Sequence, residues 1–165
     1  METTLDKQNI GNAGEYYIAS LLSAYGFTAT ITLGRAEKYD ILALSPKGRT
    51  IKISVKTRIK ENIKRFPLSK KDEKGGDTNS YYAFIRLNEL KKEPDFWIIP
   101  GKRVGKLIKN AHKKYLATPG KRVKQRKDTN LRNLWIKMTK TSKPLFPKDW
   151  GQELTTYYKN IKQLW

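Results

Sequence analysis

The sequence predicts an α+β (α/β) fold in which a mixed central sheet of about five strands is flanked by helices. Two observations carry this prediction. Short β-branched and aliphatic runs occupy the middle of the chain, and amphipathic runs with helical spacing precede and follow them. The 165 residues contain no repeat and no linker, so we expect a single domain over 1–165. Its core should span about 5–115, and a basic C-terminal extension about 116–165.

The first expected element is a helix over 5–25. Apolar residues such as Ile18 and Leu22 recur every three or four positions, and Gly26 is placed to end the helix. Glu15 lies beside this apolar stripe, where a carboxylate needs a cation, a metal or a backbone donor. A boundary glutamate that reaches solvent or pairs with a lysine explains Glu15 equally well.

A strand over 27–33 and a β-hairpin over 39–56 come next. The hairpin consists of two aliphatic and β-branched runs joined by a Ser-Pro-Lys-Gly turn. Asp40 stands at the start of its first strand and Lys56 at the end of its second. Antiparallel pairing brings Asp40 close to Lys56, and the two-residue alternation of a strand puts Ser54 on the same face as Lys56.

Apolar periodicity disappears over 57–79, which we expect to be a loop that is either solvated or in contact with phosphates. The acids of this loop, Asp72 among them, are expected to be solvated. The later elements follow in order: strands over 80–87 and 95–100, a helix over 103–114, an irregular basic stretch over 117–132, a short strand or turn over 133–136, and a closing helix over 149–164.

The chain is strongly basic, with 35 Lys and Arg against 15 Asp and Glu and a formal net charge of +20. Such an excess indicates a polyanionic partner, because each neutralised phosphate releases a counterion. Solubility is the alternative explanation of any one charged face. The basic residues that we expect to contact nucleic acid lie at the start of the helix over 103–114, directly before it, and in the stretch after it: Lys102, Arg103, Lys106, Lys121, Arg122, Lys124, Arg126 and Lys127.

Several classes of protein are excluded by composition. The absence of cysteine excludes disulfides and thiolate metal sites. His112 is the only histidine, which makes a zinc site improbable, and we expect it to be exposed on a basic helix. No apolar run approaches the ~20 residues of a membrane span. We therefore expect a cytoplasmic protein with no membrane partner.

The hairpin carries the parts of a metal-dependent phosphodiesterase site. Hydrolysis of a phosphodiester needs charge stabilisation at phosphorus and an activated water, and Mg²⁺ can supply most of this. Mg²⁺ prefers oxygen ligands and keeps several waters, so few carboxylates suffice. We expect Asp40 to be a metal ligand and Lys56 to polarise the attacking water or hold the phosphate. Taken alone, each has an ordinary explanation, as a strand-edge acid and a strand lysine.

At this point the hairpin resembles the core of the PD-(D/E)xK nuclease superfamily, to which restriction enzymes, Holliday-junction resolvases and intron homing endonucleases belong. The resemblance implies a restriction-endonuclease-like core and a divalent-metal-dependent DNA endonuclease of restriction, repair or junction type, with Mg²⁺ or Mn²⁺ as cofactor. It implies the catalytic set Glu15, Asp40, Ser54 and Lys56, with Asp40, Glu15 and the Val55 carbonyl as metal ligands. Further short similarities link 11–17, 55–57, 96–100 and 116–120 to small bacterial proteins of this superfamily.

Ser54 departs from the family pattern, which has an acid there and in some groups a glutamine. A hydroxyl binds a metal more weakly than a carboxylate, so we expect reduced metal affinity and a greater dependence on substrate phosphate as a ligand. A catalytically weakened or inactive nuclease fold that only binds DNA or RNA is the alternative to an active enzyme.

The expected partner is double-stranded or branched DNA, with RNA as an alternative, and a homodimer would allow both strands to be cut. A basic structural protein associated with ribosomes or RNA is a third interpretation, against which Glu15 counts as a carboxylate beside a buried stripe.

Overall fold

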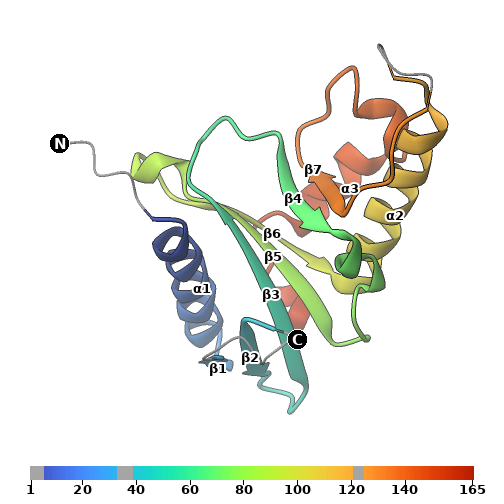
Figure 1. The fold of residues 1–165 in the computed structure, drawn as a ribbon. Helices are drawn as coiled ribbons and strands as arrows, with labels where there is room; N and C mark the ends of the chain where they lie inside the picture. The colour runs from blue at the N-terminus through green and yellow to red at the C-terminus, as the bar shows by residue number, and fades with distance from the viewer. Residues whose placement is uncertain (1–5, 33–38, 121–124) are drawn as a thin grey trace.

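The computed structural model describes residues 6–32, 39–120 and 125–165. Five strands form the central sheet in the order β1-β2-β3-β5-β6, and two more form a small separate sheet, β4-β7 (Figure 1). The strands are β1 Thr28–Ile31, β2 Ile41–Leu44, β3 Thr50–Arg58, β4 Arg65–Ser69, β5 Ser80–Arg86, β6 Asp95–Pro100 and β7 Leu131–Trp135. The α-helices are α1 Lys7–Ala24, α2 Gly101–Ala117 and α3 Trp150–Tyr157.

The central sheet is mixed, as the sequence predicted. β1, β2 and β3 pair antiparallel, β3 and β5 pair parallel, and β5 and β6 pair antiparallel. The predicted hairpin is β2-β3, and its turn is closed by the Gly48 N–H, which donates to the Ser45 carbonyl at 2.9 Å. Gly48 has a φ of +79°, a left-handed conformation that a residue without a Cβ adopts at no steric cost.

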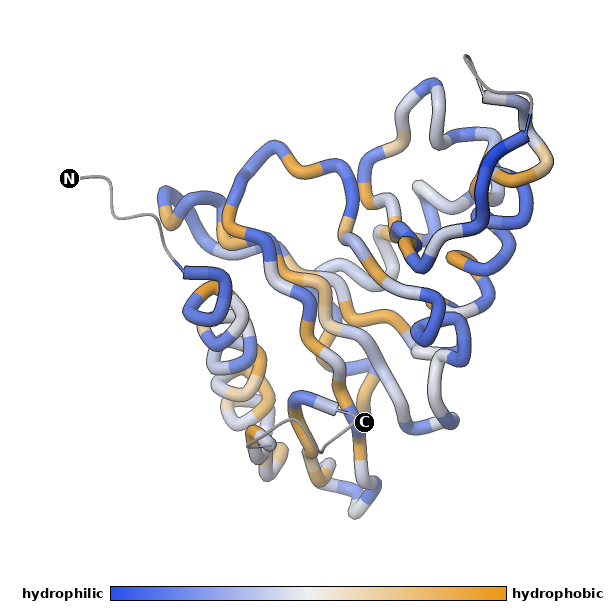
Figure 2. Tube along the Cα trace, viewed as in Figure 1, coloured by the Kyte–Doolittle hydropathy of each residue, from blue (hydrophilic) through white to orange (hydrophobic). Residues whose placement is uncertain are grey.

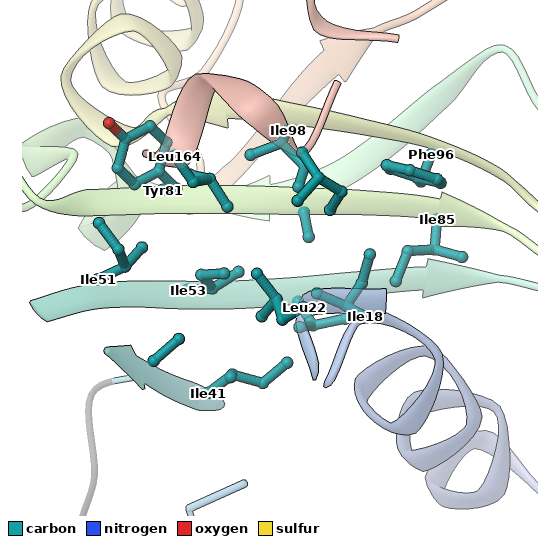
Figure 3. Packing of buried hydrophobic residues seen from close by; sticks show 14 of the residues in the cluster. Ile18, Leu22, Ile41, Ile51, Ile53, Tyr81, Ile85, Phe96, Ile98 and Leu164 are labelled. Carbon is teal, nitrogen blue, oxygen red and sulfur yellow. The ribbon is translucent and has the colours of Figure 1, made fainter. Parts of the chain in front are cut away.

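The two faces of the sheet carry separate hydrophobic clusters. Alternation along β3 turns Ile51, Ile53 and Val55 toward α1, where they pack with residues such as Ile18 (Figure 3). The opposite face is covered by α2, α3 and the β4-β7 sheet (Figure 1). β5 is buried on both faces over Ser80–Ile85, which explains the unbroken run of aromatic and aliphatic residues in its middle. Figure 2 shows the hydropathy of the chain around it.

The stretch predicted as a loop over 57–79 contains structure that the prediction missed. It includes β4 and a 3-10 helix, η1 Lys70–Lys74. Phe66 and Leu68 are buried and alternate with exposed Arg65 and Pro67, but over only five residues. β4 is stabilised by pairing with β7, far away in the sequence, so no local periodicity announces it. Pro67 lacks an N–H donor, a property that strands near a sheet edge tolerate.

The closing helix was predicted too long. α3 ends at Tyr157, and a second short helix, η4 Lys162–Leu164, follows separately. Between them Lys159 has a φ of +51°, and its N–H donates to the Phe96 carbonyl of β6. The chain thereby passes the edge of the sheet, and Leu164 joins the α1-side cluster while α3 packs on the other face. The predicted helix over 103–114 is α2, which extends further at both ends.

None of the helices in the described ranges is both long and apolar enough to cross a membrane.

Candidate active site at the end of β2

Asp40 is held in place by the neighbouring strand. Its backbone N–H donates to the Ile53 carbonyl at 2.9 Å, and its Oδ2 accepts the Val55 N–H at 2.6 Å. The carboxylate therefore lies beside Val55 of β3, just beyond the last backbone pair between β2 and β3, Ile41 with Ile53. Because this hydrogen bond comes from the backbone, it fixes Asp40 whatever the side chain at position 55.

The Val55 carbonyl faces the same side as Asp40. The Lys52 N–H donates to the Asn79 carbonyl before β5, and the Arg58 carbonyl accepts the Leu87 N–H after β5. The backbone groups of even-numbered residues of β3 therefore point toward β5. Odd-numbered residues bond toward β2, and the N–H and C=O of one residue point the same way. The Val55 carbonyl thus lies beside the Asp40 carboxylate, on the side where β2 has stopped.

Ser54 and Lys56 occupy the opposite face of β3 from α1, beside Tyr82 and Phe84 of β5. Both are half-buried, and neither side chain makes a hydrogen bond or ion pair with another described residue. The Lys56 ammonium is nevertheless close enough to Glu15 and to Asp72 to act on the pKa of both carboxyls.

Lys56 also borders a groove of about 350 Å³ that runs between the start of α1, the end of β3 and β4. The charged residues lining this groove are all basic: Lys7, Lys56, Arg58 and Lys60. A polyanionic chain lying in it would pass next to the Lys56 ammonium.

Glu15 reaches this site because α1 approaches β3 unusually closely. A Cβ added at Gly14 would lie 1.9 Å from the Thr57 Oγ1 of β3, so only glycine permits the observed contact. Glu15 follows directly on the helix and is half-buried. Burial raises its pKa, the Asp40 charge raises it further, and the Lys56 charge opposes both. Glu15, Asp40 and Lys56 therefore lie within electrostatic reach of one another, although they come from three separate elements.

Asp72 is a charged residue of this region that the sequence prediction misplaced. It was expected to be solvated, but it is only 9% exposed. Burial disfavours its charge, yet the Ser69 N–H, the Ser69 hydroxyl and the Tyr82 hydroxyl all donate to it, and Lys56 is close. Together they lower its pKa. The Ser-x-x-Asp spacing of a capping box is the sequence signal that could have identified it.

Tyr82 connects Asp72 to the site. Burial raises the Tyr82 pKa, as do its hydrogen bond to Asp72 and the charge of Asp40. Its register partner on β3 is Ser54. Ser54 is therefore next to a neutral phenol that already donates a hydrogen bond to Asp72.

The donor set matches what Mg²⁺ requires only in part. In the described part of the chain no three Asp, Glu, His or Cys side chains cluster closely enough to enclose a metal. Two carboxylates, those of Glu15 and Asp40, and one backbone carbonyl are present. One or two carboxylates plus substrate phosphates are typical of Mg²⁺ sites. The residues fit an ion bound together with substrate better than an ion bound to the protein alone.

The predicted nucleic-acid contacts differ in their availability. Lys102, Lys106 and Lys127 are exposed. Arg103 is half-buried and forms a two-pronged ion pair with Glu153, which ties α2 to α3 and leaves it less available for a phosphate. Arg126 is half-buried. The remaining three, Lys121, Arg122 and Lys124, lie outside the described residues.

His112, expected to be exposed, has a side chain only 11% exposed, and it is hydrogen-bonded to Asp128 at 2.8 Å. It lies on α2, apart from Asp40, and has no place in the site.

Two solved structures are similar to this chain over most of their length. The bacterial homing endonuclease I-Ssp6803I has 13% sequence identity and a TM-score of 0.48, with 92% of this chain and 94% of that chain covered. Hjc, a Holliday junction resolvase from the archaeal hyperthermophile Archaeoglobus fulgidus, has 15% identity and a TM-score of 0.46, with 83% and 89% covered. No protein-family model and no curated protein sequence matches the chain.

Proposed function

We propose that this protein is a divalent-metal-dependent DNA endonuclease that hydrolyses phosphodiester bonds. The observation that supports the proposal most strongly is the convergence of Glu15, Asp40 and Lys56, with the Asp40 carboxylate fixed by the Val55 N–H at 2.6 Å. A structural protein has no need to hold two carboxylates near each other, because each makes the other harder to ionise. Such groupings are typical of functional sites.

The basic groove suggests how the substrate lies. A DNA strand along Lys7, Lys60 and Lys56 would place a phosphate beside Asp40, and its negative charge would be neutralised by a groove without carboxylates among its lining residues. In hydrolysis the oxygen of water bonds to phosphorus while one ester P–O bond breaks. The Lys56 ammonium is placed to stabilise the phosphate charge or to orient the water.

Asp40, Glu15 and the Val55 carbonyl would hold the metal ion, which we propose to be Mg²⁺ or Mn²⁺. When bound, it supplies positive charge to the phosphate and lowers the pKa of a coordinated water. The raised pKa of Glu15 means that ligation also relieves the unfavourable proximity of its charge to Asp40. Metal affinity should therefore fall as pH falls and Glu15 takes up a proton.

The second candidate is a nucleic-acid-binding protein without catalysis. The specific observation in its favour is Ser54, together with the absence of a three-carboxylate cluster from the described residues. It predicts tight, salt-sensitive binding that no substitution at Asp40 disturbs.

Cleavage of supercoiled plasmid and of a panel of branched and linear DNA and RNA distinguishes the two. Wild type is compared with Asp40→Asn and Lys56→Met, in Mg²⁺, Mn²⁺ or EDTA. Asparagine retains an oxygen that can accept the Val55 N–H. Lys47→Met is the matched control, because Lys47 is an exposed lysine in the turn of the same hairpin.

We expect metal-dependent cleavage that both site variants reduce by at least about 100-fold, while Lys47→Met has no effect and binding in EDTA persists. Tight binding by wild type with no cleavage in either metal would contradict the enzyme and support the second candidate. Equal cleavage by wild type and Asp40→Asn would show that the site is elsewhere.

A further inference from the structure

A second cavity lies away from Asp40, between α2, β7 and the segment around the 3-10 helix η3 Lys143–Leu145. It has a volume of about 630 Å³. Its floor is apolar, with Ile108, Leu145 and Phe146 among the lining residues, and Tyr115 and Trp135 also line it. We call it the Tyr115–Trp135 pocket. Cavities of several hundred Å³ with a few placed polar groups are the size class that binds small organic groups.

Two arginines at this pocket lie over the Tyr115 and Trp135 rings. The Arg126 guanidinium is 4.1 Å from the centre of the Tyr115 ring, and the Arg65 guanidinium is 5.0 Å from the Trp135 ring. Neither arginine forms an ion pair with any carboxylate in the described ranges. Their charges therefore remain available to an anion that enters the pocket.

The carboxylate nearest this pocket is already neutralised. Asp128 is bound to His112 at 2.8 Å and lies 3.4 Å from the Lys70 ammonium and 3.5 Å from Arg132. Arg132 in turn is bound to Glu73, which keeps it buried and engaged. The pocket thus combines two aromatic–guanidinium pairs and an apolar floor with the polar side chains of Thr118, Thr129, Asn133 and Thr141.

This combination fits a nucleotide. A nucleobase stacks on aromatic rings and on guanidinium planes, and the free arginine charges suit its phosphate. The pocket offers no carboxylate pair for a metal or a cationic ligand. A base inside a duplex has both faces covered by its neighbours, so only an unpaired base can enter.

β4 connects this pocket to the candidate active site. Arg65 lines the pocket, and Phe66 and Pro67 line the basic groove that holds Lys56. Consecutive residues of a strand are only about 3.3 Å apart, so β4 borders both depressions. A nucleic-acid strand in the groove can continue past β4 with one nucleotide turned into the pocket.

We propose that the Tyr115–Trp135 pocket holds an unpaired nucleotide of the nucleic acid that lies in the Lys56 groove. The substrate class would then be DNA with an unpaired nucleotide, at a bulge, gap, flap or junction. The proposal rests on the proposed function only in taking nucleic acid as the partner. It does not require that the chain cleaves.

Binding measured in EDTA, where no cleavage occurs, tests this. The probes are a duplex with one bulged 2-aminopurine and a fully paired duplex with the same fluorophore. The variants are Tyr115→Ala and, as matched control, Tyr25→Ala, because the two tyrosines are 38% and 39% exposed and Tyr25 lies at the end of α1. Arg65→Gln serves as a second pocket variant, since Arg65 is exposed and its replacement should not disturb folding.

We expect wild type to bind the bulged duplex about 10-fold more tightly than the paired duplex, with a change in 2-aminopurine fluorescence only for the bulge. Tyr115→Ala and Arg65→Gln should remove most of this preference, and Tyr25→Ala should retain it. Binding of the paired duplex by Tyr115→Ala should stay within twofold of wild type.

Tight binding of both duplexes with no preference would overturn the pocket but leave nucleic-acid binding and the proposed function intact. Binding of neither duplex would overturn both. A free mononucleotide is added as competitor in a separate arm. If it abolishes the fluorescence change at micromolar concentration while the bulge is not preferred, the pocket is a free-nucleotide site and the proposal is wrong.

Discussion

Replacing Gly14 by alanine tests whether the close approach of α1 and β3 forms the site. Within an ordinary helix this change stabilises by about 1 kcal/mol, because alanine is the best helix former. Here the new Cβ would lie 1.9 Å from the Thr57 Oγ1 and 3.0 Å from both its Cβ and its Cγ2. Turning the Thr57 side chain to another rotamer leaves its Cβ at 3.0 Å, so α1 has to move away from β3.

Forcing extra atoms into a packed contact costs about 1 to 3 kcal/mol, and the severity of this clash favours the upper half of that range. After subtraction of the helix-propensity gain, Gly14→Ala should lose about 1 to 2 kcal/mol of unfolding free energy. Gly11→Ala is the matched control, because it lies on the same helix with no atom within 4 Å of the added Cβ. It should gain about 0.5 to 1 kcal/mol.

Thermal unfolding and plasmid cleavage are the two assays. A difference of about 2 kcal/mol between the variants corresponds to about 4 to 8 °C in Tm for a chain of this size. Because Glu15 moves with α1, Gly14→Ala should also lose cleavage at a temperature where both variants are folded. Adding Thr57→Ala to Gly14→Ala should recover part of the stability. If Gly14→Ala melts at or above Gly11→Ala, the close contact does not exist and Glu15 is not held beside Asp40 in this way.

Three further results are expected. Burial and the Asp40 charge raise the pKa of Glu15, so Glu15→Gln should stabilise the fold by about 0.5 kcal/mol at pH 7 after allowance for solvent screening. Urea unfolding should show this gain vanish as pH falls below about 4.5, where Glu15 is protonated in both the folded and the unfolded state. Hydrogen bonds from Tyr158, Asn88 and Arg86 outweigh burial and lower the pKa of Asp95 to about 2. The ionised Asp95 should therefore contribute about 1 to 2 kcal/mol to the free energy of unfolding, and this contribution is lost as pH falls from 3.8 through 2. Asp95→Asn should abolish that pH dependence in acid unfolding. Ser54→Glu should lower the Mg²⁺ concentration needed for half-maximal cleavage and should lower Tm when metal is absent.

The sequence predicted what is local. The β2-β3 hairpin has its strands, its turn and its acid within the 19 residues from Asp40 to Arg58, so alternation and turn chemistry determine its register. That register then dictates that Asp40 lies beside Val55 and that Ser54 and Lys56 share a face. Helix α1 was predictable for the same reason, because its apolar spacing is intrinsic to one segment.

What the sequence did not predict depends on contacts between distant segments. β4 exists because it pairs with β7, where Arg65 is opposite Trp135. Residues Phe66 and Leu68 show too short an alternation to indicate a strand on their own. Burial of Asp72 depends in turn on where β4 ends and on Tyr82 of the central sheet. α3 stops where Lys159 bonds to β6, a constraint that helical periodicity in 149–164 cannot reveal.

The serine at position 54 is consistent with the charges around it. Burial and the charge of Asp40 already raise the pKa of Glu15, so the site without metal disfavours further negative charge near Glu15. A glutamate at position 54 would add a third negative charge next to Tyr82, which already donates its proton to Asp72 and has no second one to offer. Without metal, that charge would be poorly solvated and would destabilise the fold, whereas bound metal would more than compensate. We therefore expect Ser54→Glu to exchange stability for metal affinity, and the native serine to leave the ion dependent on the DNA phosphate as a ligand. If Ser54→Glu changed neither Tm nor the Mg²⁺ requirement, position 54 would not belong to the site.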